Sequence, residues 1–299
     1  MEAVIEKNEG NVRLEWHECR VCGVRGRNKT YTAREMMYGT KQEFPYFVCE
    51  NCKCMQIVEV PDHLGEYYNN DSYYSFDKRK YKEFDGNATY TDSKILDVGC
   101  GTGEYLLEMA GQGYGNLYGC DPFIEEDIRY GDRVYIKKCE IDEMDGEYDC
   151  IRFGDSFEHV TNPLETLQEV KRLLKRNGIC QINMPVFPNA AFDTFGINWY
   201  QIDAPRHIFL HSKNSMKILC EKSGLKIEKI EFNSNVFQFI CSYYYEKGIP
   251  LKTFENEFYT SIKEIDLETF EFFEDATDKM NEKGYGDHAC FYIGHDSED

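Results

Sequence analysis

Two pairs of cysteines near the start of the chain have the spacing of metal ligands. Cys19 and Cys22 form the first C-x-x-C pair, and Cys49 and Cys52 form a second pair after 26 intervening residues. Each pair can place two thiolates on one ion, so together they can complete the tetrahedral four-sulfur shell of structural zinc. Core cysteines that happen to be paired are the alternative. A redox C-x-x-C is disfavoured, because no helix begins behind either pair to lower a thiol pKa.

A glycine-rich turn over residues 99–103 carries a second chemical signal. The segment ILDVGCGTGE, residues 95–104, reads as a buried strand, a turn with glycine at three alternate positions and the start of a helix. Glycine permits positive φ and lets a ligand lie against the main chain, while unpaired N–H groups at a helix start attract an anionic group. Asp121 ends the next apolar strand, the place from which a carboxylate holds ribose hydroxyls in doubly wound folds. The pattern therefore predicts a site for a cofactor that contains a nucleoside.

Alternating strands and helices from residue 93 onward would position these groups. Such alternation predicts an α/β fold with a parallel sheet that is covered by helices on both faces. The expected strands are 94–98, 117–120, 134–136, 148–153, 179–183, 225–232 and 288–295, with two more at 44–48 and 55–60 around the second cysteine pair. The expected helices are 104–112, 163–176 and 213–223.

Three parts are expected along the chain. Residues 1–62 form a small zinc-ribbon-like module, residues 63–92 form a tyrosine-rich linker or lid, and residues 93–299 form the α/β domain. Packing of aromatic side chains between domains is the alternative for the tyrosine-rich part. A helical insertion over 243–283 carries an apolar stripe for packing on the body or on a second copy: Phe258, Ile262, Ile265, Thr269, Phe272 and Ala276.

The composition excludes several classes of protein. The 299 residues are 41% hydrophobic, which is enough apolar mass for a folded core. No run of 18 apolar residues and no secretory signal occurs, so we expect a cytoplasmic protein whose 13 cysteines are reduced. Because 34 Lys and Arg face 54 Asp and Glu, the net charge is −20, which disfavours a nucleic-acid partner.

The segment Asp97–Gly103, DVGCGTG, resembles motif I of the class I S-adenosylmethionine-dependent methyltransferases. Further segments resemble that family's ribose-binding acid, its fourth strand with an "EH" motif, and its next helix and strand: 118–121, 148–160 and 163–183. Two more, NWY at 198–200 and PRH at 205–207, resemble a bacterial subgroup in which a cysteine-rich zinc module and a tyrosine stretch precede the domain. Members of that subgroup are associated with methylation of sugars and cell-surface polysaccharides.

The resemblance implies a Rossmann-like sheet of seven strands, with S-adenosylmethionine and zinc as cofactors. The methionine end of S-adenosylmethionine would lie at the glycine turn, its ribose at Asp121 and its adenine near Glu140 or Ile141. The residues expected to bind it are Asp97, Gly99, Cys100, Gly101, Gly103, Asp121, Pro122, Glu140, Ile141, Phe153, Gly154 and Asp155.

Two histidines are candidates for the general base that methyl transfer to a hydroxyl or a carbon requires. His159 follows the fourth strand and His207 follows the fifth, at the sheet edge where ligands bind; a purely structural role is the alternative for each. Arg206 could hold an acidic or phosphate-bearing substrate through a bidentate contact. Other residues expected to line the substrate pocket, with packing as the alternative, are Tyr73, Tyr74, Trp199 and Tyr200.

The first expectation is therefore a methyltransferase that acts on a small, sugar-linked molecule, with oligomerisation through the C-terminal helix as an option. An RNA methyltransferase is the second hypothesis, which a local basic cluster favours: Arg20, Arg25, Arg27, Lys29 and Arg34. The third is a methyltransferase-fold binding protein that does not turn over.

Overall fold

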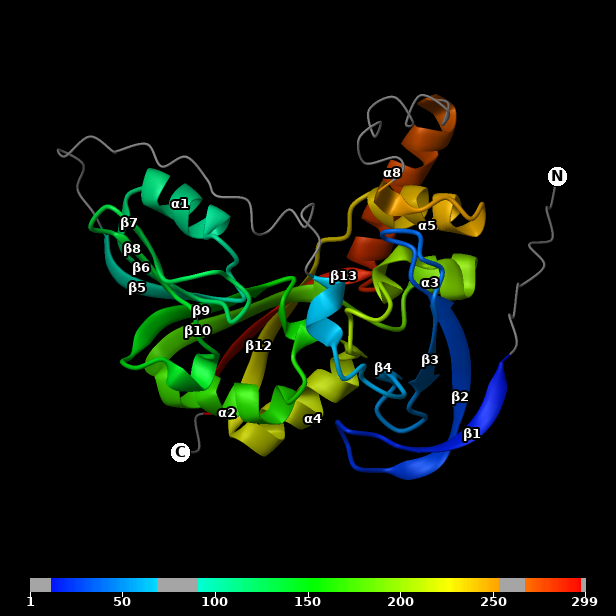
Figure 1. Ribbon diagram of the computed structural model, residues 1–299, viewed down its shortest axis with the longest axis horizontal. Coiled ribbons are helices and arrows are strands. Elements are labelled where there is room, and N and C mark those ends of the chain that lie inside the picture. The colour runs from blue at the N-terminus through cyan, green and yellow to red at the C-terminus, as the bar shows by residue number, and fades with distance from the viewer. Residues whose placement is uncertain (1–11, 69–90, 253–266, 297–299) are drawn as a thin grey trace. The chain divides into compact units, whose positions relative to one another are not determined.

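The computed structural model describes residues 12–68, 91–252 and 267–296 (Figure 1). The chain divides into two compact units whose segments interleave along the sequence. Unit 1 comprises Met1–Leu64, Pro185–Ile218 and Glu231–Ala289, and unit 2 comprises Gly65–Met184, Leu219–Ile230 and Cys290–Asp299. The domains expected from the sequence, residues 1–62, 63–92 and 93–299, stay a prediction. No helix in the described part of the chain is long and apolar enough to cross a membrane.

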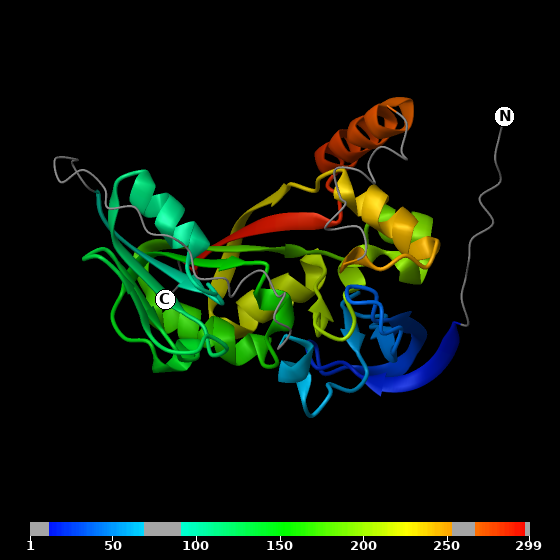
Figure 2. The same cartoon turned by 45° about the horizontal axis from the view of Figure 1, so that its top comes forward.

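A sheet of eight strands, with the order β12-β13-β10-β9-β5-β6-β8-β7, forms the frame of unit 2. The pairs β5–β6, β5–β9, β9–β10 and β6–β8 are parallel, as the alternating pattern predicts. Figure 2 shows β13 in red beside β12. The strands are β5 Thr91–Val98, β6 Tyr114–Cys120, β7 Ile128–Tyr130, β8 Val134–Lys137, β9 Tyr148–Gly154, β10 Leu174–Pro185, β12 Leu225–Phe232 and β13 His288–His295.

The expected α/β fold class is confirmed, with one strand more than the seven expected. The additional strand, β7, is short and pairs with β8 in the antiparallel sense at the sheet edge. Helix α1, Glu104–Gly111, packs Leu106 and Ala110 against strands β5, β6 and β8 in a buried aliphatic cluster. Cys100, within the glycine turn, packs against this cluster, so packed side chains support the turn.

The helix expected over 163–176 is three residues shorter in the structure. Helix α2, Pro163–Leu173, stops where Leu174 adopts an extended conformation and begins β10. Leu174 pairs with Tyr148 and is buried, and the Lys175 ammonium lies 2.8 Å from the Asp149 carboxylate. Pairing along β9 therefore overrides the helical pattern of the last residues.

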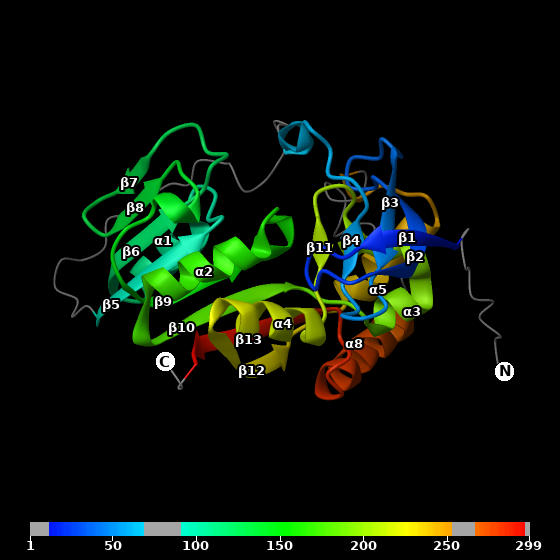
Figure 3. The ribbon, with the colours of Figure 1, turned by 90° about the horizontal axis from the view of Figure 1, so that it is seen from below.

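A five-stranded antiparallel sheet, with the order β1-β2-β3-β4-β11, forms the frame of unit 1. Strand β4 is shorter than the strand expected over 55–60, and β11, which comes from a distant part of the sequence, pairs with it (Figure 3). The strands are β1 Arg13–Glu18, β2 Arg25–Arg34, β3 Glu43–Val48, β4 Met55–Ile57 and β11 Phe209–Leu210. Helices α3 Ala190–Phe195, α5 Phe237–Glu246 and α8 Leu267–Glu282 belong to unit 1, whereas α4 Lys213–Ser223 has residues in both units.

Phe272 of the apolar stripe expected over 243–283 does not pack on the body of the protein, and packing on a second copy stays a prediction. This side chain is 66% exposed, whereas Phe270 and Phe273 of α8 pack against the buried face of α5. Of the other expected members, Thr269 and Ala276 belong to α8, whereas Phe258, Ile262 and Ile265 lie outside the described residues.

Candidate cofactor site and metal centre

The glycine turn joins β5 to α1 and takes the left-handed conformation at each of its three glycines. The φ angles are 71° at Gly99, 52° at Gly101 and 87° at Gly103, as the motif predicts. A Cβ at Gly99 would lie 2.6 Å from Ser156 Cβ, and one at Gly103 would lie 2.4 Å from Ile136 Cδ1. Close packing within the protein therefore demands glycine at these two positions, in addition to any room that a ligand needs.

Asp121 follows β6, and its two carboxylate oxygens accept one N–H from the glycine turn and one from the segment after Asp121. Its Oδ2 accepts the N–H of Gly101 at 2.8 Å, and its Oδ1 accepts the N–H of Phe123 at 2.8 Å. Burial raises the pKa of this carboxyl, and the backbone donors partly oppose that rise. A carboxylate has about four acceptor positions, so Asp121 retains acceptor capacity for a ribose hydroxyl beside its backbone donors.

Asp97 lies at the end of β5 and forms an ion pair that the sequence interpretation missed. Asp97 is 3% exposed, and its Oδ1 accepts from Arg152 Nη1 at 3.0 Å. The Arg152 guanidinium also lies 3.9 Å from the centroid of the Tyr105 ring. Burial raises the pKa of Asp97 to about 6, and the nearby guanidinium opposes the rise.

Gly154 leaves the room that the Arg152 guanidinium occupies. A Cβ at Gly154 would lie 2.2 Å from Arg152 Nη1. The signal that could have found Arg152 is the register of β5 and β9, in which Asp97 and Arg152 are direct neighbours. That register depends on the strand order, which the sequence alone does not state.

The remaining residues expected at the cofactor lie around the same sheet edge in unit 2. Ile141 is buried, and Glu140 forms a reciprocal capping box at the start of the short helix Ile141–Glu143. Phe153 is fully buried and makes an edge-to-face contact with Phe157. The Cys100 thiol points at β6, because a Cβ at Gly119 would lie 2.5 Å from its sulfur. Pro122 directly follows Asp121, and Asp155 has a positive φ of 53°.

His159 ends the short helix Phe157–His159 and contacts a tyrosine from the segment before the sheet. Tyr68 Oη lies 2.9 Å from His159 Nδ1. The Tyr68 ring also stacks on Phe123, with 5.4 Å between the centroids. Tyr68 therefore links the candidate base to the segment that follows Asp121. The sequence did not indicate this role, because Tyr68 is one of many tyrosines in its segment. Tyr73 and Tyr74 lie outside the described residues.

The other expected substrate residues, together with His207, lie in unit 1 and are mostly buried. Trp199 is 1% exposed, and its indole N–H donates to the Asp287 carboxylate at 2.9 Å. Tyr200 begins the short helix Tyr200–Ile202 and is half-buried. His207 Nδ1–H donates to the carbonyl oxygen of Gln201 at 2.7 Å.

Arg206 is fully buried, and its guanidinium is held by two carboxylates of unit 1. It donates to Asp203 at 2.8 Å through Nε and to Glu35 at 3.0 Å through Nη2. Glu35 in turn accepts the N–H groups of Tyr38 and Thr40. The network ties β2 and the loop that follows it to the segment before β11. A buried guanidinium with two carboxylates is poorly placed to recruit an anionic substrate.

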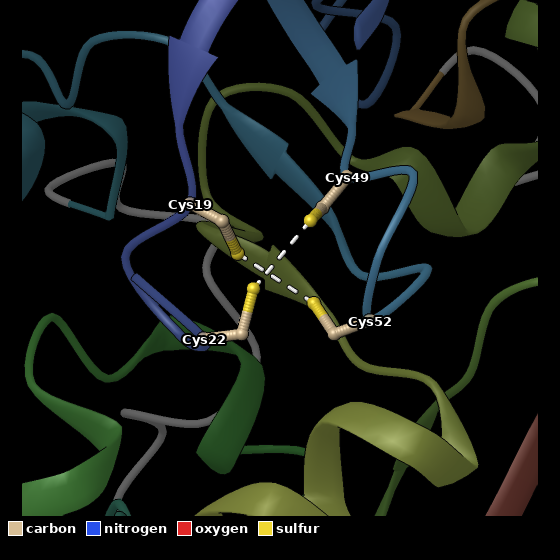
Figure 4. Close-up of side chains that lie close together, drawn as sticks. All are labelled: Cys19, Cys22, Cys49 and Cys52. Carbon is tan, nitrogen blue, oxygen red and sulfur yellow. Dashed lines mark hydrogen bonds between the residues drawn. The ribbon is translucent and has the colours of Figure 1, made fainter. Parts of the chain in front are cut away.

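The four paired cysteines converge on one point of unit 1 (Figure 4). Their Sγ atoms all lie within 4.8 Å of one another. The sulfurs of Cys19 and Cys52 are 3.5 Å apart, and those of Cys22 and Cys49 are 3.6 Å apart. Thiolates bound at about 2.3 Å to one tetrahedral zinc ion are about 3.8 Å apart. The arrangement therefore fits a four-cysteine zinc site.

Each cysteine pair closes a tight turn of the same design. The N–H of Gly23 donates to the carbonyl of Cys19, and the N–H of Lys53 donates to the carbonyl of Cys49. Both turn-closing residues have positive φ, 77° at Gly23 and 62° at Lys53. Gln56 Nε2 donates to the Cys19 sulfur at 3.1 Å, as a neighbour that stabilises a thiolate would.

Comparisons with known proteins match parts of this chain. A family model described as a methyltransferase domain matches residues 76–230, which is more than half of the chain. A tRNA U34 carboxymethyltransferase of Campylobacter jejuni, strain 81116, is 25% identical over 142 residues, which cover 44% of this chain and 49% of that protein. The chain thus spans about half the length of the curated relatives it matches.

Two solved structures are similar in part. Mycolic acid cyclopropane synthase CmaA1, complexed with SAH and CTAB, has a TM-score of 0.45 and 14% identity, over 69% of this chain and 79% of that one. An O-methyltransferase from a Brevibacillus brevis trans-AT PKS multienzyme has a TM-score of 0.42 and 15% identity, over 69% and 67% of the two chains. The family model covers the glycine turn, Asp121 and the strands that position them, and the chain belongs to the methyltransferase-domain family.

Proposed function

We propose that this protein is an S-adenosylmethionine-dependent methyltransferase, with the cofactor held by unit 2. The observation that carries the proposal is the turn of three left-handed glycines braced by Asp121, inside the region that the family model matches. The residues fit the cofactor, because Asp121 offers acceptor capacity for a ribose hydroxyl beside backbone that carries no Cβ. When bound, the cofactor supplies a methyl group activated by its sulfonium.

The Asp97–Arg152 pair suits the amino-acid end of the cofactor. A methionine moiety carries one carboxylate and one ammonium group, and this pair presents a guanidinium and a carboxylate 3.0 Å apart at the end of β5 and β9. Arg152 is about a quarter exposed, with 23% of its side chain accessible, whereas the Asp97 side chain is 4% accessible. We therefore assign Arg152 to the carboxylate and Asp97 to the ammonium.

His159 is the better placed of the two candidate bases, because it is half-buried while His207 is buried. A histidine that removes a proton through Nε2 carries its own proton on Nδ1. Tyr68 Oη is positioned to accept that Nδ1–H and so to hold the imidazole in the required tautomer. His207 has the same tautomer, because a carbonyl oxygen accepts from its Nδ1.

We propose a small, sugar-linked molecule as the acceptor. Support comes from the resemblance of the segments 198–200 and 205–207 to sugar and polysaccharide methyltransferases. Within those segments the burial of Trp199 and Arg206 supports roles in holding unit 1 together. A tRNA is the second candidate acceptor, which the similarity to the tRNA carboxymethyltransferase favours and the net charge of −20 disfavours.

We also propose that Cys19, Cys22, Cys49 and Cys52 hold one structural zinc ion. A shell of four thiolates leaves no open coordination position for a substrate or a water molecule, so zinc here would stabilise the fold of unit 1.

Calorimetry with S-adenosylmethionine and its demethylated product tests the cofactor site. We expect micromolar binding that falls at least tenfold in Asp121→Ala and in Asp121→Asn, because both variants lose a carboxylate oxygen that the ribose would use. Asp132→Ala, which removes an exposed carboxylate from the same unit, is the matched control and should bind as the unaltered protein does. Absence of heat at millimolar cofactor would refute the proposal.

Release of the demethylated cofactor measures turnover and identifies the acceptor class. Nucleotide sugars and tRNA are supplied in parallel, and His159→Ala is compared with His159→Gln. We expect turnover with the nucleotide sugars, with at least a hundredfold loss in both variants if His159 removes the proton. Cofactor binding without release for any acceptor would instead support the non-enzymatic hypothesis.

A further inference from the structure

The antiparallel pair β1–β2 carries a row of exposed cations beside an exposed tryptophan. The register places Trp16 opposite Arg27, Leu14 opposite Lys29 and Glu18 opposite Arg25. Residues directly opposite in an antiparallel pair lie on the same face of the sheet. We call the face that carries these six side chains the ribbon face. Trp16 is 65% exposed and Leu14 is 54% exposed, and all three cations are exposed.

The cations of the ribbon face are not neutralised within the structure. Among the residues described, no carboxylate forms an ion pair with Arg25, Arg27 or Lys29. Residues 13–29 hold five Lys and Arg against two Glu, whereas the whole chain has a net charge of −20. The charge on this strand pair is therefore opposite in sign to that of the molecule, which favours an anionic partner at this one place.

The spacing of the cations fits a chain of anions better than a single one. Alternate residues on a strand are about 6.7 Å apart, so Arg25, Arg27 and Lys29 span about 13 Å in a line. Further along β2 the same face is covered, because Tyr31 packs edge-to-face on Phe192 at 5.6 Å. The exposed cations thus occupy the first half of β2, before the position that Phe192 covers.

An open hollow of about 470 Å³ lies at the Arg25 end of this row, where Glu18 and Arg20 also line it. Trp16 and Arg25 contribute to its lining, together with the His17 and Phe47 rings, which stack with 4.5 Å between their centroids. A hollow of this size accommodates a planar heterocycle. On the ribbon face itself the aromatic side chain is Trp16, because His17 alternates with it along β1. An aromatic face beside a line of cations is the combination that binds bases and phosphates of a single strand.

We propose that the ribbon face binds single-stranded RNA. Trp16 stacks on a base, and Arg25, Arg27 and Lys29 contact phosphates, with Glu18 weakening the end of the row at Arg25. This inference goes beyond the proposed methyl transfer, because binding at the ribbon face requires neither the cofactor nor turnover.

Tryptophan fluorescence tests the proposal directly. The chain has two tryptophans, and Trp199 is buried with its N–H bonded to Asp287, so quenching by a ligand reports on Trp16. The probe is a single-stranded oligouridylate of about twelve nucleotides, added to the full-length, zinc-containing protein without cofactor. We expect quenching at 50 mM salt. The association constant should fall with a logarithmic salt slope of about −2, as three phosphate contacts predict.

Variants separate stacking, charge and fold. Trp16→Ala should weaken oligouridylate binding about tenfold, as measured by anisotropy, while Trp16→Phe keeps most of the affinity. Replacing the three cations by alanine should weaken binding at least tenfold and flatten the salt slope. Alanine at three exposed lysines elsewhere, Lys217, Lys279 and Lys283, removes equal charge and should leave both values unchanged.

Three results would overturn the proposal. The first is no quenching at low salt, and the second is an equal loss of oligouridylate affinity in the control with alanine at Lys217, Lys279 and Lys283. The third is polyphosphate binding as tight as that of oligouridylate, together with no effect of Trp16→Ala. Zinc content and circular dichroism confirm that each variant is folded. Calorimetry with S-adenosylmethionine in the cation variant separates this result from the proposed activity, because the cofactor site should bind unchanged.

Discussion

Two buried carboxylates flank the glycine turn, and the structure holds them in different ways. Asp97 is neutralised by the guanidinium of Arg152, whereas Asp121 is held by uncharged backbone donors. The two acids therefore have separate tasks in the same turn. Asp97 forms an ion pair at the ends of β5 and β9, whereas Asp121 fixes the position of the backbone and forms no ion pair in the part of the chain that the structure describes.

The raised pKa of Asp97 predicts a distinct dependence of stability on pH. The carboxyl has a pKa of about 6 in the folded protein against 3.8 for its ordinary value, so the folded state binds the proton more tightly. As pH rises from 4 to 6, the unfolded chain ionises first, and the folded protein loses about 3 kcal/mol of stability through this group.

Urea unfolding of the protein and of Asp97→Asn at pH 4.5, 5.5, 6.5 and 7.5 measures this loss. The unfolding free energy of the unaltered protein should fall relative to that of Asp97→Asn up to about pH 6.5, and the difference should then stay constant. A difference that does not change with pH would show that Asp97 ionises normally in the folded protein.

At the scale of elements, close packing fixes the conformation of the turn between β5 and α1. Gly103 is the residue before α1, it has a φ of 87°, and no side chain caps the helix N-terminus there. The first N–H groups of a helix have no partner within the helix itself, and such groups attract anions. Gly103 packs against Ile136, so the turn also contacts strand β8.

Gly103→Ala should destabilise unit 2 by about 2 kcal/mol or more. The new Cβ would force both a left-handed conformation on alanine and a displacement of Ile136. Cofactor affinity should fall along with the urea midpoint. Gly65→Ala in the same unit is the control, because a Cβ there meets nothing within 4 Å; equal midpoints for the two variants would contradict the strained turn.

The end of α2 shows how one element overrides another. The amphipathic pattern continues to Leu174, which the sequence interpretation placed in the helix, but the structure places this residue in β10 opposite Tyr148. Helical periodicity reports only which side chains are buried, and Leu174 is buried in either conformation. The competing backbone bonds come from β9, where the partner Tyr148 lies 26 positions earlier in the chain.

At the scale of the whole molecule, unit 1 is assembled from three separated segments around the cysteine site. The Tyr46 hydroxyl donates to the carbonyl of His207, and Ser212 Oγ donates to the carbonyl of Cys52. Strand β11 extends the sheet that begins with β1. The cysteine-rich part therefore shares its core with residues that lie more than 100 positions later in the chain.

Removing the metal should loosen unit 1 as a whole. We expect about one zinc ion per chain by metal analysis, and Cys52→Ser should lose it. Chelation should lower the unfolding temperature and increase proteolysis within 12–64 and 185–218 together, because these segments pack as one. Cys54→Ser, which alters the neighbouring buried thiol outside the four-sulfur cluster, should keep its zinc. An unaltered unfolding temperature after chelation would argue against a structural metal.

The sequence by itself determined the chemistry-bearing residues whose spacing is local. The glycine turn, the acid at position 121 and the two cysteine pairs could be predicted, because each depends on a few neighbouring residues and on the strand or helix beside them. The strand alternation likewise predicted the parallel sheet, since the periodicity of burial is written along the chain.

Only the tertiary structure decided which distant residues meet. Arg152 reaches Asp97 through the register of two strands, Tyr68 reaches His159 across 91 positions, and Arg206 is enclosed by carboxylates from two different segments. Pairing of β1 with β2 likewise brings Trp16 beside the cations of β2. These contacts depend on strand order and chain path, which are set by the packing of the whole core and leave no local mark in the sequence.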